Sequence, residues 1–290
     1  MTGIGATRPI WIVARMTFQE AIRRRIVLTG LILGILFLIV FSIGMRLIST
    51  EIARETTLEG GSAYQNIMQT EMSNFLLMAG LYAVTFLSVA MGALLGADTL
   101  AGEINSGSIQ TIVTKPVRRS DVVFGKWLGF ASLLGLYALL MAGGVVLVVF
   151  LQSGYLPRNM LTGLSLIYLE SLLVMTISLA GSSAMPALAT GGMVFGLYGL
   201  AFLGGWIEQI GSLANNPAAV KIGIVTSLVV PTEALWRRAA YEMQTPLASA
   251  LGMSPFGAFS VPSLLMVAYA VLYLLSVLVI AVSTFNRRDI

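Results

Sequence analysis

The chain contains no cysteine and no histidine, and charged residues make up 10% of its 290 residues. Without cysteine, disulfides and thiolate chemistry are excluded, and without histidine the commonest general base and metal ligand is missing. The shortage of charge is more informative, because about 25% of residues are charged in a soluble domain. With 57% hydrophobic residues and a mean hydropathy of +0.89, the composition indicates an integral membrane protein.

Six apolar segments are long enough to cross a hydrocarbon core of about 30 Å as helices. Each is about 19 to 25 residues long, and unpaired backbone polar groups are too costly in lipid for an irregular conformation. The segments lie at residues 26–45, 74–95, 127–151, 161–179, 187–207 and 263–284. The sequence therefore predicts an all-α integral membrane protein, with six transmembrane helices in a single domain over residues 1–290.

The basic residues are distributed unevenly around these segments, which predicts an orientation by the positive-inside rule. One face receives Arg8, Arg15, Arg23, Arg24, Arg25, Lys115, Arg118, Arg119, Lys126, Arg287 and Arg288. The opposite face receives the other six of the 17 basic residues, diluted by glutamates that include Glu208 and Glu233. We therefore expect both termini in the cytoplasm and the chain in the inner, cytoplasmic membrane of the cell.

Residues 10–25 precede the first apolar segment and have a different character. Trp11, Ala14 and Phe18 recur at helical spacing, while Arg15 and Arg23 lie largely on another face. This pattern predicts an amphipathic helix in the cytoplasmic interface, with its apolar side toward the lipid. A soluble helix packed on a partner protein is the alternative.

Residues 208–262 are neither apolar enough to cross the membrane nor polar enough to form a free loop. Their apolar stretch 222–230 is about nine residues long, which is too short to span. Pro217 and Pro231 interrupt the segment, and Thr232 can cap a following helix. We expect an outer-face loop whose short helices lie on, or dip into, the outer leaflet.

Glycine pairs four residues apart occur in several of the apolar segments. They are Gly30 and Gly34, Gly92 and Gly96, Gly125 and Gly129, and Gly192 and Gly196. Such pairs allow helices to approach closely and to pack by van der Waals contact. We expect them mainly to pack helices within this chain, and each is also weak support for a seam between two subunits.

A polar, basic segment, residues 98–126, joins the second and third apolar segments. Glu103 and neighbouring polar residues surround apolar ones such as Ile104, and Pro116 stops any helix before Arg118. A short amphipathic helix, joined at both ends to membrane spans, would transmit a push from a cytoplasmic protein. A loop that merely anchors the topology fits the same residues equally well.

The same segment carries several short motifs: Gly102-Glu103-Ile104, Gly107-Ser108-Ile109-Gln110, Lys115-Pro116-Val117, Arg119 and Gly125-Lys126. With residues 17–21 and the ending 285–289, they resemble the ABC type-2 (ABC-2) transporter permeases. Within these the resemblance is to the branch of multicopper-enzyme maturation permeases. The similarity extends over essentially the whole chain and is most specific in the polar segment.

The resemblance implies a permease subunit of an ATP-driven ABC exporter with an unknown cargo. In that family, the polar segment acts as a coupling helix that docks on a separate ATP-hydrolysing subunit, which binds ATP and Mg²⁺. Two permease subunits, identical or different, assemble with two ATPases. The residues implied in coupling are Glu103, Ile104, Ser108, Gln110, Lys115, Pro116, Arg118 and Arg119.

The chain itself offers no recognisable site for ATP, a metal or catalysis. Gly125-Lys126 does not complete a phosphate-binding loop, because Ser120 and Trp127 occupy positions that require Gly and Ser or Thr. The 15 methionines are scattered and have no Cys or His to support copper binding. We expect a transport subunit that binds no cofactor and no nucleic acid, with the lipid membrane around it.

Glu170 lies near the middle of the fourth apolar segment, where a charged carboxylate costs about 3 kcal/mol on insertion scales. The side chain should therefore face protein, water or cargo rather than lipid. Cargo contact or gating is one role, and a structural hydrogen bond made by the protonated acid is the other. An ion-coupled secondary transporter with Glu170 as its proton carrier is the alternative function. An intramembrane enzyme is not indicated, because the spans contain no paired-carboxylate motif.

Overall fold

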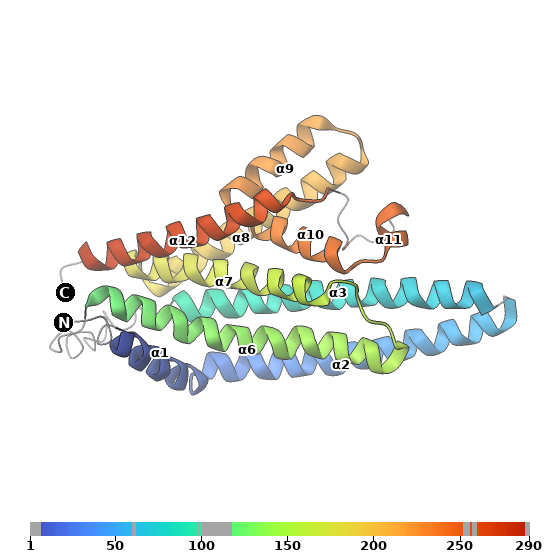
Figure 1. The fold of residues 1–290 in the computed structure, drawn as a ribbon, viewed down its shortest axis with the longest axis horizontal. Helices are drawn as coiled ribbons and strands as arrows, with labels where there is room; N and C mark the ends of the chain where they lie inside the picture. The colour runs from blue at the N-terminus through green and yellow to red at the C-terminus, as the bar shows by residue number, and fades with distance from the viewer. Residues whose placement is uncertain are drawn as a thin grey trace.

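The computed structural model describes residues 7–59, 62–97, 99, 118–251, 256 and 260–287. Within these ranges the chain is helical and contains no strand (Figure 1). The helices are α1 Thr7–Ile22, α2 Arg25–Glu59, α3 Ser62–Ala97, α6 Arg119–Ser153, α7 Met160–Ala184, α8 Ala187–Leu213, α9 Pro217–Val229, α10 Thr232–Met243, α11 Pro246–Leu251 and α12 Leu264–Arg287.

Six of these helices are long and apolar enough to cross a membrane: α2, α3, α6, α7, α8 and α12. Each coincides with one of the predicted apolar segments, to within one residue at the start of α12, so the prediction of an all-α membrane protein with six spans is confirmed. The helices extend beyond the apolar segments, and α2 has 35 residues. At 1.5 Å per residue α2 is about 50 Å long, so it extends beyond a hydrocarbon core of about 30 Å.

Both termini lie at one end of the molecule, and α3 ends and α6 begins at that same end (Figure 1). The opposite ends of α2 and α3 meet at the far end of the bundle. This arrangement is what an even number of spans requires. The side of the membrane on which the termini lie stays a prediction.

Close packing of α3 against α7 builds the centre of the bundle. A Cβ atom at Gly92 would lie 2.9 Å from the backbone oxygen of Ser171, and one at Gly96 would lie 2.6 Å from the Cβ of Ser178. The Ser178 hydroxyl donates a hydrogen bond of 2.6 Å to the backbone oxygen of Ala93. The two glycines therefore let the helices approach to backbone contact, as small residues do in membrane proteins.

The other glycine pairs differ in what they contact. Gly30 and Gly34 face methionine and tyrosine side chains of α3 and α6, while Gly125 and Gly129 face α1. Gly192 and Gly196 on α8 would have nothing within 4 Å of an added Cβ. Packing within this chain therefore accounts for the first three pairs and not for the pair on α8.

Helix α1 packs lengthwise on α6. A Cβ at Gly129 would lie 2.7 Å from the backbone oxygen of Ala14 and 2.9 Å from the Cβ of Thr17. Ala14 and Thr17 are buried, whereas Trp11 is 71% exposed. The small apolar residues of α1 thus bind the bundle, and larger ones such as Trp11 and Ile12 are left facing outward. A position in the membrane interface stays a prediction.

The segment between α8 and α12 folds into short helices. Helix α9 lies along α8, and the chain then bends by 107° between α9 and α10. Asn216 caps α9 by accepting hydrogen bonds from the backbone N–H groups of Ala218 and Ala219. The predicted cap at Thr232 is wrong, because α10 is preceded by Pro231 and the Thr232 hydroxyl has no hydrogen-bond partner among the described residues.

Candidate functional site

The residues predicted to couple the chain to an ATPase fall mostly outside the described residues. These are Glu103, Ile104, Ser108, Gln110, Lys115 and Pro116. The last part of the expected loop 98–126 belongs to α6, which begins at Arg119, and Lys126 is buried within that helix.

The adjacent Arg118 and Arg119 have different surroundings. Arg118 is exposed and immediately precedes α6. The side chain of Arg119 is half-buried and turns toward α12, where its Nη1 donates to the backbone oxygen of Asn286 at 3.4 Å. Arg118 is therefore available to a partner, whereas Arg119 joins the ends of two helices.

Glu170 lies on the central helix α7 and has no exposed surface. Neither carboxyl oxygen has a hydrogen-bond partner in the described part of the chain. The structural hydrogen bond that we considered for this acid thus has no counterpart among the described side chains. Glu170 nevertheless lies inside the protein and does not face lipid, where a carboxylate would be unfavourable.

A second buried carboxyl group lies on α10. Glu233 on α10 is 1% exposed, and its two oxygens likewise lack hydrogen-bond partners among the residues described. Helix α10 packs tightly here, because a Cβ at Gly205 of α8 would lie 2.0 Å from the Cγ of Glu233.

A buried ion pair lies one turn along α10 from Glu233. Arg237 of α10 contacts Glu208 of α8 through Nη1 at 2.6 Å from Oε1 and through Nη2 at 2.9 Å from Oε2. Ser260 donates a further hydrogen bond of 2.8 Å to Glu208. Because a buried charge is tolerated when it is paired and hydrogen-bonded, Glu208 and Arg237 neutralise each other.

Glu208, Glu233 and Arg237 are all buried inside the bundle. The 107° bend before α10 turns this helix into the bundle, where it packs against α7 and α8. Glu233 and Arg237 lie four residues apart on α10, a spacing at which side chains of opposite charge can pair. Arg237 instead binds Glu208, which lies 29 positions earlier in the chain.

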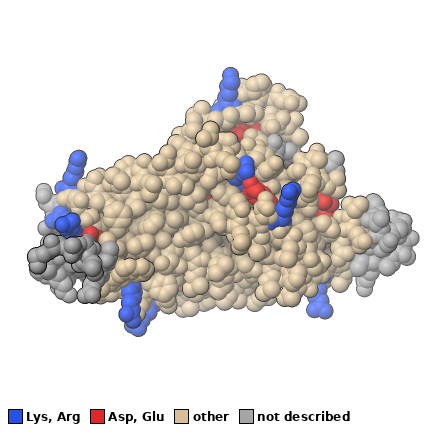
Figure 2. All heavy atoms as spheres, in the orientation of Figure 1, with Lys and Arg blue, Asp and Glu red and all other residues tan. Residues whose placement is uncertain are grey.

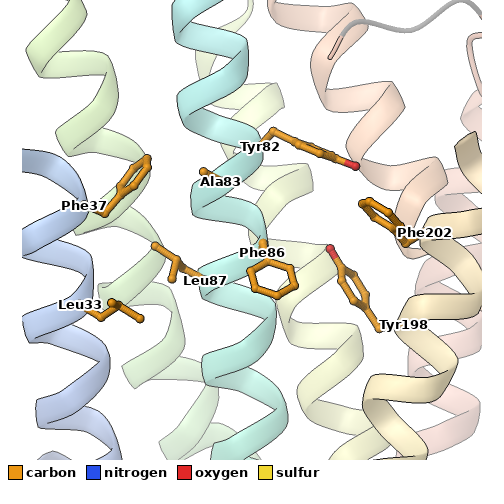
Figure 3. A pocket seen from close by; sticks show the side chains of 8 residues that line it. All are labelled: Leu33, Phe37, Tyr82, Ala83, Phe86, Leu87, Tyr198 and Phe202. Carbon is orange, nitrogen blue, oxygen red and sulfur yellow. The ribbon is translucent and has the colours of Figure 1, made fainter. Parts of the chain in front are cut away.

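The bundle also contains a pocket lined mainly by aromatic and apolar side chains. It has a volume of about 440 Å³ and lies between α2, α3 and α8 (Figure 3). Its lining residues are Leu33, Phe37, Tyr82, Ala83, Phe86, Leu87, Tyr198 and Phe202. The surface of this pocket is almost entirely apolar.

The two tyrosines of the pocket differ in their hydrogen bonding. Tyr82 accepts a bond from the indole N–H of Trp206 at 3.3 Å, and its ring lies 4.9 Å from that of Trp236. The hydroxyl of Tyr198 has no bond to any described group and points from α8 toward α3 (Figure 3). The ring of Tyr198 is 6.2 Å from that of Phe86.

Comparison with known proteins gives one finding on the whole chain. A family model described as ABC-2 family transporter protein matches residues 11–290. The matched range includes all six candidate spans, the polar segment 98–126 and the buried acids. A comparison with curated proteins found no match.

Proposed function

This chain belongs to the ABC-2 transporter family, and on that premise we propose that it is the membrane subunit of an exporter driven by a separate ATPase. Membership makes it a multi-pass membrane permease of an ABC transporter, and it does not favour a secondary transporter that uses Glu170. The observation that carries the proposal is that α3 ends and α6 begins where both termini lie (Figure 1). The basic segment between these helices is thus tethered at the end that the charge distribution assigns to the cytoplasm.

The finer assignments rest on the motifs of this segment. We propose the branch of multicopper-enzyme maturation permeases, because the motifs from Gly102-Glu103-Ile104 to Gly125-Lys126 resemble that branch. The ATPase would bind ATP and Mg²⁺, while this chain contributes no cofactor site. A second permease subunit, identical or different, would complete the transporter in the inner membrane.

The packing of α3 and α6 suggests how ATP hydrolysis would move the cargo. Closure of the ATPase pair would displace the segment between α3 and α6, and both helices would move as rigid bodies. Helix α3 contacts α7 through Gly92 and Gly96, and α6 carries α1 on Gly125 and Gly129. A shift of α3 relative to α8 would change the aromatic pocket between them.

The direct test is to co-express this chain with a candidate ABC ATPase from the same genome and to purify the complex through a tag on the chain. We expect the ATPase to copurify and to hydrolyse ATP in a transport-coupled manner. In the same complex Glu103→Lys should uncouple ATP hydrolysis from transport, because it reverses a charge at the proposed contact, while membrane insertion is unchanged. A complex with wild-type coupling in the Glu103→Lys variant would refute the docking assignment.

A further inference from the structure

A groove runs between α1 and α6 on the outside of the bundle, at the end where the termini lie (Figure 1). It has a volume of about 520 Å³. Its lining includes Trp11, Arg15 and Phe18 of α1 and Leu128 and Ser132 of α6. Most of these side chains are exposed, so the groove is open to whatever surrounds the protein at this level.

The groove lies where α6 enters the membrane. Lys126 is the last charged residue before the uncharged segment 127–151, and Leu128 stands at the start of that segment. One residue further on, a Cβ at Gly129 would lie 2.7 Å from the backbone oxygen of Ala14, the neighbour of Arg15. The guanidinium of Arg15 is thus placed at the boundary between charged and uncharged chain, which is the level of the lipid headgroups.

Arg15 brings to this groove a positive charge that the described chain does not neutralise. Its side chain is exposed and has no hydrogen bond or ion pair with the residues described. The acid of α1, Glu20, is bound by Arg24 at 2.8 Å. Arg23 and Arg25, both exposed, add positive charge where α1 is followed by α2. This end of the groove therefore attracts an anionic group.

An apolar track continues from the groove along α6. Leu128, Leu136 and Leu139 are exposed, and their spacing places them on one face of the helix. From Leu128 to Leu139 the helix rises about 16 Å, which matches the thickness of about 15 Å of one hydrocarbon leaflet. The track is therefore long enough for one acyl chain.

Aromatic side chains of α1 flank the charge. Trp11, Arg15 and Phe18 are spaced by four and three residues, so they lie on one side of the helix. Trp11 combines an apolar ring with a polar N–H group, a combination that favours the headgroup level of a bilayer. From the end of the chain inward, the groove thus offers a cation, aromatic surface and aliphatic surface, in the order that complements the phosphate, glycerol and acyl parts of a phospholipid.

We propose that the groove between α1 and α6 binds an anionic phospholipid of the leaflet nearest the termini, with its phosphate on Arg15 and an acyl chain along α6. The proposal goes beyond the proposed function, because it assigns a bound lipid and not a cargo. Basic pockets at membrane helices bind anionic headgroups in this way. A zwitterionic lipid also carries a phosphate, but its ammonium group would lie among the arginines, so the anionic lipid is preferred.

Two lipids with the same acyl chains and different headgroups test the proposal. Palmitoyl-oleoyl phosphatidylglycerol and palmitoyl-oleoyl phosphatidylcholine would each be titrated into the delipidated full chain in a neutral detergent. Native mass spectrometry measures the fraction of protein with lipid bound. We expect phosphatidylglycerol to bind at least about fivefold more tightly, which is the factor that one basic residue contributes near an anionic lipid surface. Equal affinity for the two lipids would overturn the site.

Substitutions in the groove locate the binding. Arg15→Gln should weaken phosphatidylglycerol binding about fivefold, while Arg15→Lys, which keeps the charge, should retain the preference. Arg23→Gln is the matched control, because it removes the same charge from an exposed arginine outside the groove lining and should have a much smaller effect. Ser132→Trp fills the groove from an exposed position on α6 and should weaken binding of both lipids although Arg15 is retained.

Unchanged phosphatidylglycerol binding in Arg15→Gln or in Ser132→Trp would overturn the proposal. An equal loss in Arg15→Gln and Arg23→Gln would do the same, because it would indicate a general attraction to surface charge. Soluble glycerol phosphate should not displace the lipid, and displacement would mean that the site takes a phosphate group alone. The same spectra report the oligomeric state, and a dimer that Ser132→Trp dissociates without loss of lipid would make the groove a contact between subunits. These measurements need no ATPase.

Discussion

At the scale of single residues, the two arginines before and at the start of α6 have separable roles. Arg118 is exposed, whereas Arg119 donates to the backbone of Asn286 in α12. Reversing the charge of Arg118 should weaken the complex with the ATPase by about tenfold through like-charge repulsion at the contact. The affinity of the purified variant Arg118→Glu for the ATPase, measured by titration, checks this.

Arg119→Glu serves as the comparison. This substitution removes the hydrogen bond from Arg119 to α12. Such a bond contributes about 1 kcal/mol or less at a partly exposed position, so the variant should be slightly less stable to heat than wild type. If Arg118→Glu binds the ATPase as tightly as wild type, Arg118 is not part of the contact.

The ion pair between Glu208 and Arg237 predicts an asymmetric response to mutation. Glu208→Leu leaves the buried Arg237 uncompensated and should destabilise the protein by about 3 to 5 kcal/mol. The double variant Glu208→Leu, Arg237→Leu should recover much of that loss, because the arginine is then no longer buried without its partner Glu208. Thermal unfolding in detergent measures both, and equal instability of the single and double variants would exclude this explanation.

The sequence indicates the environment of Glu170 but not that of Glu233. Glu170 lies in an uncharged stretch that must be inside the membrane, so its burial follows from the cost of exposing it to lipid. Glu233 is followed within ten residues by Arg237, Arg238 and Glu242, a composition typical of a solvated helix. The environment of Glu233 depends on Glu208, which is distant in the sequence. Glu208 binds Arg237, the arginine that the local sequence would place as the partner of Glu233.

At the scale of helices, the seam between α3 and α7 should not accept an additional methyl group. A Cβ at Gly96 would lie 2.6 Å from the Cβ of Ser178 and 2.9 Å from the backbone nitrogen of Leu179. Gly96→Ala should therefore destabilise the protein by about 1 to 3 kcal/mol, because backbone must move to accommodate it.

Gly143→Ala on α6 is the matched control, since nothing lies within 4 Å of an added Cβ there. Alanine is favoured over glycine inside a helix by about 0.5 to 1 kcal/mol, so this variant should be as stable as wild type or slightly more stable. Thermal unfolding of the two variants in the same detergent decides the point. Equal tolerance of both substitutions would mean that α3 and α7 are not in close contact.

The long helices were predictable because hydropathy reports directly on immersion in lipid. Their ends were not, since α2 continues past residue 45 through polar residues that a helix can carry in water. The 107° bend between α9 and α10 was also not predictable from the sequence. Pro231 marks an interruption, but the direction of the next helix is set by packing against α7 and α8, which no local pattern records.

At the scale of the whole molecule, the surface and the topology agree with a protein that lipid surrounds. Most of the visible face carries no charged side chain (Figure 2). Both termini and the ends of α3 and α6 that flank the polar segment lie together (Figure 1). We propose that an ATPase in the cytoplasm moves α3 and α6 through the segment at that end.

The location of this segment can be measured in cells, because the chain has no cysteine and a single introduced one reports unambiguously. Ser106→Cys places a thiol within the segment. We predict that a membrane-impermeant maleimide labels it after the membrane is permeabilised and not in intact cells. Labelling in intact cells would place the segment outside the cell and contradict the account.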